Sequence, residues 1–120
     1  MVLVDTSVWI DHFRSGVPAL AEALVNGMVL LHPVVIGELA TGNLKHRDAT
    51  LADLRRQPMA SEGTFEECLH FIEAHRLHGL GVGWNDIQLL VSAGLSRTPL
   101  WSTDRRLADT AKRLRLDFTR

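Results

Sequence analysis

The stretch Val2-Leu3-Val4-Asp5-Thr6-Ser7-Val8-Trp9-Ile10 defines the fold of this chain. Three consecutive apolar residues, Val2 to Val4, are typical of a short strand that is buried on both faces. Asp5 then places a carboxylate at the carboxyl end of that strand, where open α/β sheets have their active sites. Apolar residues at helical spacing follow. The opening stretch therefore predicts a strand, an acidic residue and a helix.

Short apolar segments alternate with helical segments along the rest of the chain. The expected strands are Met1–Val4, Met28–Leu31, Pro99–Ser102 and Leu116–Thr119. The expected helices are Ser7–Arg14, Ala19–Asn26, Pro33–Thr41, His46–Gln57, Thr64–Leu77, Trp84–Leu95 and Arg105–Leu114. Short strands separated by helices indicate a parallel sheet that is covered on both faces. The pattern therefore predicts the α/β fold class.

Length and composition narrow the class of protein further. A chain of 120 residues with 46% apolar residues is expected to form one domain, residues 1–120, with a single core. No apolar run reaches the roughly 20 residues that cross a bilayer, and no signal peptide is recognisable. Cys68 is the only cysteine, which excludes a disulfide within the chain. We therefore expect a cytoplasmic protein without a membrane partner.

Charge is distributed unevenly along the chain, although the net charge is only −1. Residues 1–100 carry 7 lysines and arginines against 11 acids, a balance of −4. The last 20 residues, which include Arg105, Arg106 and Arg120, have a balance of +3. A basic segment beside an acidic body can contact phosphates, but a solvated helix face explains the same pattern equally well.

Two further acids lie on helical segments. Glu38 follows Val34 and Val35 by four and three residues, so it shares their apolar face of the helix. A carboxylate on such a face needs a partner or a cation, because burying an unpaired charge is costly. Asp86 begins the helix that follows the glycine-rich segment 79–83. An exposed edge position would explain Glu38 equally well, and the helix dipole would explain Asp86.

Asp104 is the fourth acid of interest, since it follows an expected strand and precedes the last helix. Capping of that helix explains its position without a functional role, as a turn does for Asp5. The four acids together favour a site, because helices after parallel strands bring their first residues to the carboxyl edge of the sheet. We therefore expect Asp5, Glu38, Asp86 and Asp104 to meet in one cleft.

Clustered carboxylates cannot all remain ionised without a cation. Oxygen ligands without a Cys or His set select Mg²⁺ or Mn²⁺ over Zn²⁺. A divalent ion at an acidic site activates water and stabilises charge on a phosphate, which is the usual arrangement for phosphodiester hydrolysis. His75 and His78 have the spacing of half a metal site but no further ligand, so we expect them to face solvent.

Four motifs resemble those of the PIN-domain ribonucleases, in family order and over nearly the whole chain. They are Val4-Asp5-Thr6-Ser7-Val8-Trp9-Ile10, Gly37-Glu38-Leu39, Gly83-Trp84-Asn85-Asp86-Ile87 and Ser102-Thr103-Asp104-Arg105-Arg106-Leu107. The chain is most similar to the VapC-type toxins of bacterial toxin–antitoxin pairs. That resemblance implies an endoribonuclease that depends on Mg²⁺ or Mn²⁺, forms homodimers and is inhibited by a cognate antitoxin protein.

The resemblance also implies a fold and a set of residue roles. The fold would be a three-layer α/β/α sandwich with a central parallel sheet of four to five strands. Catalysis and metal binding would fall to the acidic quartet, which consists of Asp5, Glu38, Asp86 and Asp104. Thr6 and Ser102 match positions that hold the metal site or its water. Independently of the resemblance, the position of Arg105 and Arg106 just past Asp104 suggests the hypothesis that one of them steadies the RNA backbone.

Other functions are compatible with parts of this pattern. A phosphatase of the haloacid-dehalogenase type needs a second Asp two residues after Asp5, where this chain has Ser7. A phosphoacceptor receiver domain needs an acidic pair and a late lysine, but Asp5 has no adjacent acid and Lys112 lies within a helix. A non-catalytic RNA- or protein-binding module of the same fold remains open. Trp9, Trp84 and Trp101 each lie within four residues of a quartet acid and are expected in the core, with stacking on RNA bases as the alternative.

Overall fold

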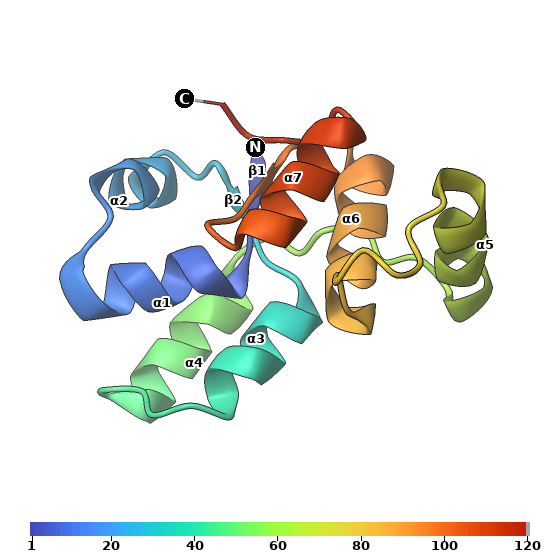
Figure 1. The fold of residues 1–120 in the computed structure, drawn as a ribbon. Helices are drawn as coiled ribbons and strands as arrows, with labels where there is room; N and C mark the ends of the chain where they lie inside the picture. The colour runs from blue at the N-terminus through green and yellow to red at the C-terminus, as the bar shows by residue number, and fades with distance from the viewer. Residues whose placement is uncertain (120) are drawn as a thin grey trace.

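Three short strands form a parallel sheet in the order β2-β1-β3 in a computed structural model that describes residues 1–119 (Figure 1). The strands are β1 (Val2–Val4), β2 (Val29–Leu30) and β3 (Leu100–Trp101). The helices in this range are α1 (Thr6–Ser15), α2 (Pro18–Val25), α3 (Pro33–Ala40), α4 (Arg47–Arg56), α5 (Phe65–His75), α6 (Trp84–Ser96) and α7 (Arg105–Arg113). The predicted α/β class with a parallel sheet is therefore confirmed.

Strand β1 is the centre of the sheet. Leu3 pairs with Leu30 on one side and with Leu100 on the other. All seven residues of the three strands are buried, as expected for a parallel sheet with helices around it. Because the strands run parallel, their carboxyl ends meet at one edge. Asp5, the turn into α3 and the segment Ser102–Asp104 all begin at that edge.

The prediction of four to five strands is wrong for residues 1–119, where the sheet has three. The expected strand Leu116–Thr119 makes only an isolated parallel bridge, between Leu100 and Asp117. A second isolated bridge joins Leu31 to Met59 at the opposite edge. Pro58 precedes Met59 and has no backbone N–H to donate, which limits pairing there. Both outer segments thus lie beside the sheet without forming a ladder.

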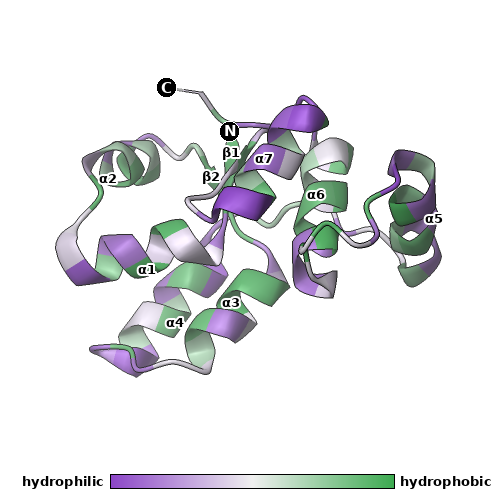
Figure 2. Cartoon of the chain, in the orientation of Figure 1, coloured by the Kyte–Doolittle hydropathy of each residue, from purple (hydrophilic) through white to green (hydrophobic). Residues whose placement is uncertain are grey.

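Helices lie on both sides of the strands, with α1 and α2 on one side and α5 and α6 on the other (Figure 1). The apolar residues gather along the strands and α6, while polar residues cover the outer surface of α7 (Figure 2). Leu3, Leu89, Leu90 and Leu107 are completely buried at the centre of this core. The packing of α6 and α7 against β3 fixes the first turns of both helices beside the sheet edge.

Helix α6, with 13 residues, is the longest helix of the described chain. A bilayer span requires about 20 apolar residues in a helix. Across residues 1–119 no helix has the length and apolarity to cross a membrane.

Candidate active site at the carboxyl edge of the sheet

Asp5 is a buried carboxylate, with 6% of its surface exposed. It caps α1, because its side chain accepts a hydrogen bond from the Ser7 backbone N–H at 3.4 Å. The same oxygen, Oδ2, accepts from Ser7 Oγ at 2.7 Å and from Ser102 Oγ at 2.8 Å. Three donors on one oxygen fix the orientation of this carboxylate. Its other oxygen, Oδ1, has no donor among residues 1–119.

Glu38 approaches the same edge from α3. Its Oε1 accepts a hydrogen bond from Thr6 Oγ1 at 2.8 Å, which links the first residue of α1 to α3. Glu38 is exposed, whereas Val35 is fully buried. The expectation that Glu38 shares an inward-facing apolar surface is therefore wrong, and Glu38 lies at the solvent edge of α3. This position keeps its second oxygen accessible.

Asp86 is half-buried in the first turn of α6. Its Oδ2 accepts a hydrogen bond from the Gly83 backbone N–H at 3.1 Å. Burial raises the pKa of Asp86, and the negative charges of Asp5, Asp104 and Glu38 raise it further. The Gly83 hydrogen bond acts in the opposite direction, but the net shift of the pKa is upward. The four predicted acids therefore share one electrostatic neighbourhood around Asp86.

Asp104 caps α7. Its Oδ1 accepts from the Leu107 backbone N–H at 3.2 Å, and its own N–H donates to Ser102 Oγ at 3.0 Å. The capping explanation for Asp104 is thus correct as far as local structure is concerned. Capping occupies only one carboxylate oxygen, so it does not compete with a second role for the other.

The four acids share one pattern of hydrogen bonding. In each, protein donors engage one oxygen: Asp5 Oδ2, Glu38 Oε1, Asp86 Oδ2 and Asp104 Oδ1. Within the described chain the second oxygen of each has no donor, and no Lys, Arg or His forms an ion pair with any of them. Excess negative charge on free oxygen ligands is the chemistry that suits a hard divalent cation.

The side chains are not already arranged as a set of metal ligands. Across residues 1–119, no group of three or more His, Cys, Asp or Glu side chains could hold a metal ion in the positions they occupy. Each quartet carboxylate is held instead by the local hydrogen bond of its own segment. The donor chemistry fits a divalent ion.

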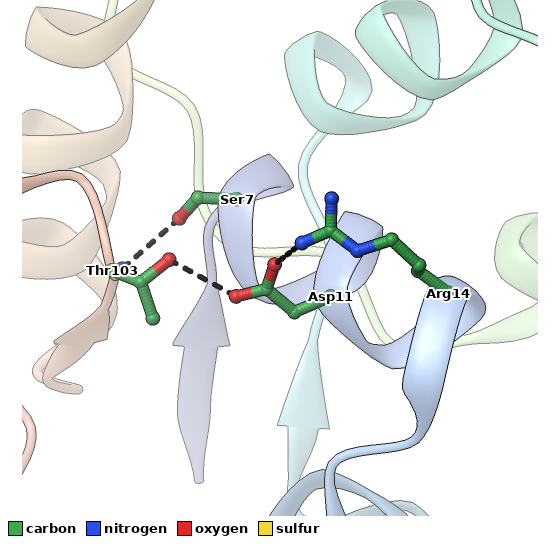
Figure 3. A network of polar contacts seen from close by, with 4 residues as sticks. All are labelled: Ser7, Asp11, Arg14 and Thr103. Atoms are coloured by element: carbon green, nitrogen blue, oxygen red, sulfur yellow. Dashed lines mark hydrogen bonds and ion pairs between the residues drawn. The ribbon is translucent and has the colours of Figure 1, made fainter.

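Ser7 connects three parts of the site and was not predicted as a site residue. Its hydroxyl donates to Asp5 and lies 3.3 Å from Ser102 Oγ. It also accepts a hydrogen bond from the Thr103 backbone N–H at 3.0 Å (Figure 3). An aspartate side chain commonly accepts from the backbone N–H two residues later, as Asp5 does from Ser7, and this turn pattern was the available signal.

Asp11 is a fifth acid near the site, one helical turn beyond Ser7. Its Oδ2 lies 3.5 Å from Thr103 Oγ1, and its Oδ1 pairs with Arg14 Nη2 at 2.8 Å (Figure 3). The ion pair neutralises Asp11, which separates it from the unpaired quartet. Together with Ser7, it ties α1 to the segment before α7.

The remaining predicted residues differ in their surroundings. Thr6 and Ser102 contact Glu38 and Asp5, respectively. The side chain of Arg105 is 94% exposed and reaches Asp109 only at 4.0 Å. Arg106 instead lies against the backbone of Gly81. Arg120 of the basic tail lies outside the described residues.

The three tryptophans and the two histidines singled out in the sequence differ in their exposure to solvent. Trp9 and Trp101 are buried in the core as predicted, at 2% and 8% exposure. Trp84 is 42% exposed, so its predicted core position is wrong. It lies beside Phe65, with the ring centroids 5.5 Å apart. His75 and His78 are exposed, as predicted.

An apolar pocket of about 660 Å³ adjoins Glu38. It lies between α1 and the α3–α4 segment, and the exposed side chains of Ile10 and Phe13 line one wall. Arg14 and Lys45 also line this pocket. The acidic edge of the sheet therefore continues directly into an apolar surface with basic side chains.

The parallel sheet with acids at its carboxyl edge agrees with a family match: the family model "PIN domain" matches residues 2–113. The chain belongs to the PIN-domain family. Within it, the chain is a VapC-type ribonuclease. It is 42% identical over 111 residues to Ribonuclease VapC32 of Mycobacterium tuberculosis, from both strain CDC 1551/Oshkosh and strain ATCC 25618/H37Rv. Each match covers 89% of this chain and 87% of the relative.

Proposed function

We propose that this chain is a toxin endoribonuclease that cleaves RNA with a divalent ion, Mg²⁺ or Mn²⁺, held by Asp5, Glu38, Asp86 and Asp104. One observation carries the proposal: each of these carboxylates keeps one oxygen on a protein donor and one oxygen free. Membership of the VapC-type PIN family supports the reaction class. The pKa of Asp86, raised by burial and by the charges of Asp5, Asp104 and Glu38, supports a site that a cation would stabilise.

The residues contribute in different ways. Three donors fix the orientation of the Asp5 carboxylate. Its free oxygen would therefore bind an ion with little further loss of side-chain entropy. Asp86 and Asp104, in the first turn of α6 and at the cap of α7, would also hold the ion. Exposed Glu38 would complete the site by holding the ion or its water. When bound, the ion activates water and stabilises charge on the scissile phosphate.

Hydroxyl groups hold the acids in place. Thr6 orients Glu38, and Ser102 joins Asp5 to the backbone of Asp104. These contacts make Thr6 and Ser102 positioning residues in the proposal. Arg105 is the exposed cation closest in sequence to the quartet, and it would contact the RNA backbone as a positive charge. Replacing it with Ala would then reduce the salt dependence of RNA binding.

We propose that residues 1–120 act as a single nuclease domain that forms a homodimer and pairs with a cognate antitoxin protein. The apolar pocket beside Glu38 suits an apolar antitoxin segment, and an arginine from that segment could pair with the quartet. Neutralising that arginine would then restore RNA cleavage in the complex. Continued inhibition by the neutralised antitoxin would exclude this mode of binding. Light scattering of the isolated chain tests the dimer.

RNA cleavage tests the proposed function. Purified protein is incubated with total RNA in Mg²⁺, Mn²⁺ or EDTA, beside Asp5→Asn and the control Asp48→Asn. Asp48 is an exposed acid at the start of α4, and its charge is not among those that raise the pKa of Asp86. We expect discrete products with either ion from the wild type and the control, and at least a hundredfold less from Asp5→Asn, as for the loss of one group that contributes to stabilising transition-state charge. Equal cleavage by Asp5→Asn, or cleavage in EDTA, would overturn the proposal and favour a binding module or a different chemistry.

A further inference from the structure

We infer that Arg106 is a positioning residue that holds the glycine loop, residues 79–83, and through this loop the carboxylate of Asp86. The inference rests on the proposed metal site and adds to it a role for a residue outside the quartet. It also replaces the expectation that Arg106 acts on RNA directly.

The side chain of Arg106 lies where a side chain on Gly81 would begin. Gly79 and Gly81 have φ angles of +74° and +80°, both in the region that favours glycine. A Cβ built on Gly81 would lie 2.8 Å from both Cδ and Nη1 of Arg106. The arginine side chain therefore lies directly on the bare backbone of Gly81, and a side chain at position 81 would displace it.

The loop leads directly to Asp86. Val82 follows Gly81 and packs against the core, and the Gly83 backbone N–H donates to Asp86 Oδ2 at 3.1 Å. That hydrogen bond directs the other carboxylate oxygen of Asp86. Only Val82 separates Gly81 from Gly83. Backbone motion at Gly81 would therefore shift the Gly83 N–H that orients the Asp86 carboxylate.

Arg106 also belongs to the helix that begins at Asp104. It lies two residues after that cap, so one side chain spans from the α7 segment of the site to the loop before α6. No described carboxylate forms an ion pair with Arg106, which is itself exposed, so its side chain is not held elsewhere by an ion pair within the described residues. Arg105 is the matched control, because it has the same charge and an adjacent position but points into solvent.

The first test uses metal-free protein. Amide hydrogen exchange of residues 79–83 is compared in the wild type, Arg106→Ala and Arg105→Ala. We expect faster exchange across the loop in Arg106→Ala, with the melting temperature nearly unchanged, and wild-type exchange in Arg105→Ala. Equal exchange in all three proteins would overturn the inference. This result does not depend on whether a metal binds.

The second test links the loop to the site. Groups that orient a metal ligand typically change affinity by about 10–100-fold when removed, so we expect Arg106→Ala to weaken Mn²⁺ binding about tenfold. Gly81→Ala should weaken it more than Gly79→Ala, which carries the same backbone strain at a φ of +74° but has open space around its Cβ. The double variant Arg106→Ala/Gly81→Ala should lose less than the sum of the two single losses, because both remove the same contact. Additive losses, or unchanged affinity in Arg106→Ala, would overturn the inference. Absence of Mn²⁺ binding by the wild type would instead refute the proposed function and leave the exchange result standing.

Discussion

Asp86 gives the clearest electrostatic signature at the scale of single residues. Burial and the charges of three other acids raise its pKa. The folded protein therefore favours the protonated form more than the unfolded chain does. Any stability from this preference is present at low pH and is lost as pH rises through the raised pKa. At neutral pH an ionised Asp86 destabilises the metal-free protein.

The substitution Asp86→Asn removes this charge and keeps an oxygen that can accept from the Gly83 N–H. We expect it to raise the melting temperature of the metal-free protein by a few degrees at pH 7, as removal of one unfavourable charge does in a small domain. The gain should shrink as pH is lowered towards the ordinary pKa of 3.8. Scanning calorimetry in EDTA measures it. A lower melting temperature in Asp86→Asn would identify Asp86 as a structural cap alone.

The sequence predicts the four acids as site residues, but it does not predict the hydrogen bonds that hold them. Asp5 and Asp104 were recognisable because each follows an apolar run at a strand end. The link from Ser7 to Thr103 joins residues 96 positions apart, which no local pattern encodes. Asp104 caps α7 through Oδ1 alone, so the proposed ligand role of its other oxygen stays compatible with the cap.

At the scale of elements, α3 shows how a helix carrying a site residue is anchored. His32 caps it, with Nδ1 accepting from the Val34 backbone N–H at 3.0 Å. His32 is buried, at 1% exposure. Burial lowers its pKa from the ordinary 6.5, and the charge of Glu62 opposes that shift without reversing it. A neutral His32 is needed for the cap, because protonated Nδ1 cannot accept.

This cap predicts a pH dependence of stability. The folded state holds His32 neutral, while the unfolded chain takes up a proton as pH falls through about 6.5. Stability present above that pH is therefore lost as pH falls towards the lowered pKa. Asn also caps helices and does not titrate here, so His32→Asn should reduce the slope of unfolding free energy between pH 7 and 5. Urea unfolding measures the slope, and exposed His75→Asn is the control. An unchanged slope in His32→Asn would contradict this account.

The sequence predicts the helix boundaries best where a proline or a capping residue marks the start of the helix. Pro18 and Pro33 begin α2 and α3, as their fixed φ favours. Thr64 and Glu67 form the capping box of α5. Strand lengths were less predictable, because pairing depends on partners elsewhere in the chain. The apolar run Met28–Leu31 yields only a two-residue strand.

At the scale of the whole molecule, the site is a product of topology. The order β2-β1-β3 brings the ends of β1 and β3 together, so residues 97 positions apart share the hydrogen bond from Ser102 to Asp5. Helices α3 and α6 then add Glu38 and Asp86 at the same edge. The sequence predicted this convergence through the general behaviour of parallel sheets. It did not predict the two isolated bridges that replace outer strands, because each depends on a single backbone register.

Calorimetric titration of Mn²⁺ into the metal-free protein tests the central claim that the four acids form one divalent-ion site. The wild type is compared with Asp86→Asn and with Asp48→Asn as the control. We predict saturable binding by the wild type and the control, and at least tenfold weaker binding by Asp86→Asn. Equal affinity in all three proteins, or no binding by the wild type at millimolar Mn²⁺, would contradict the account.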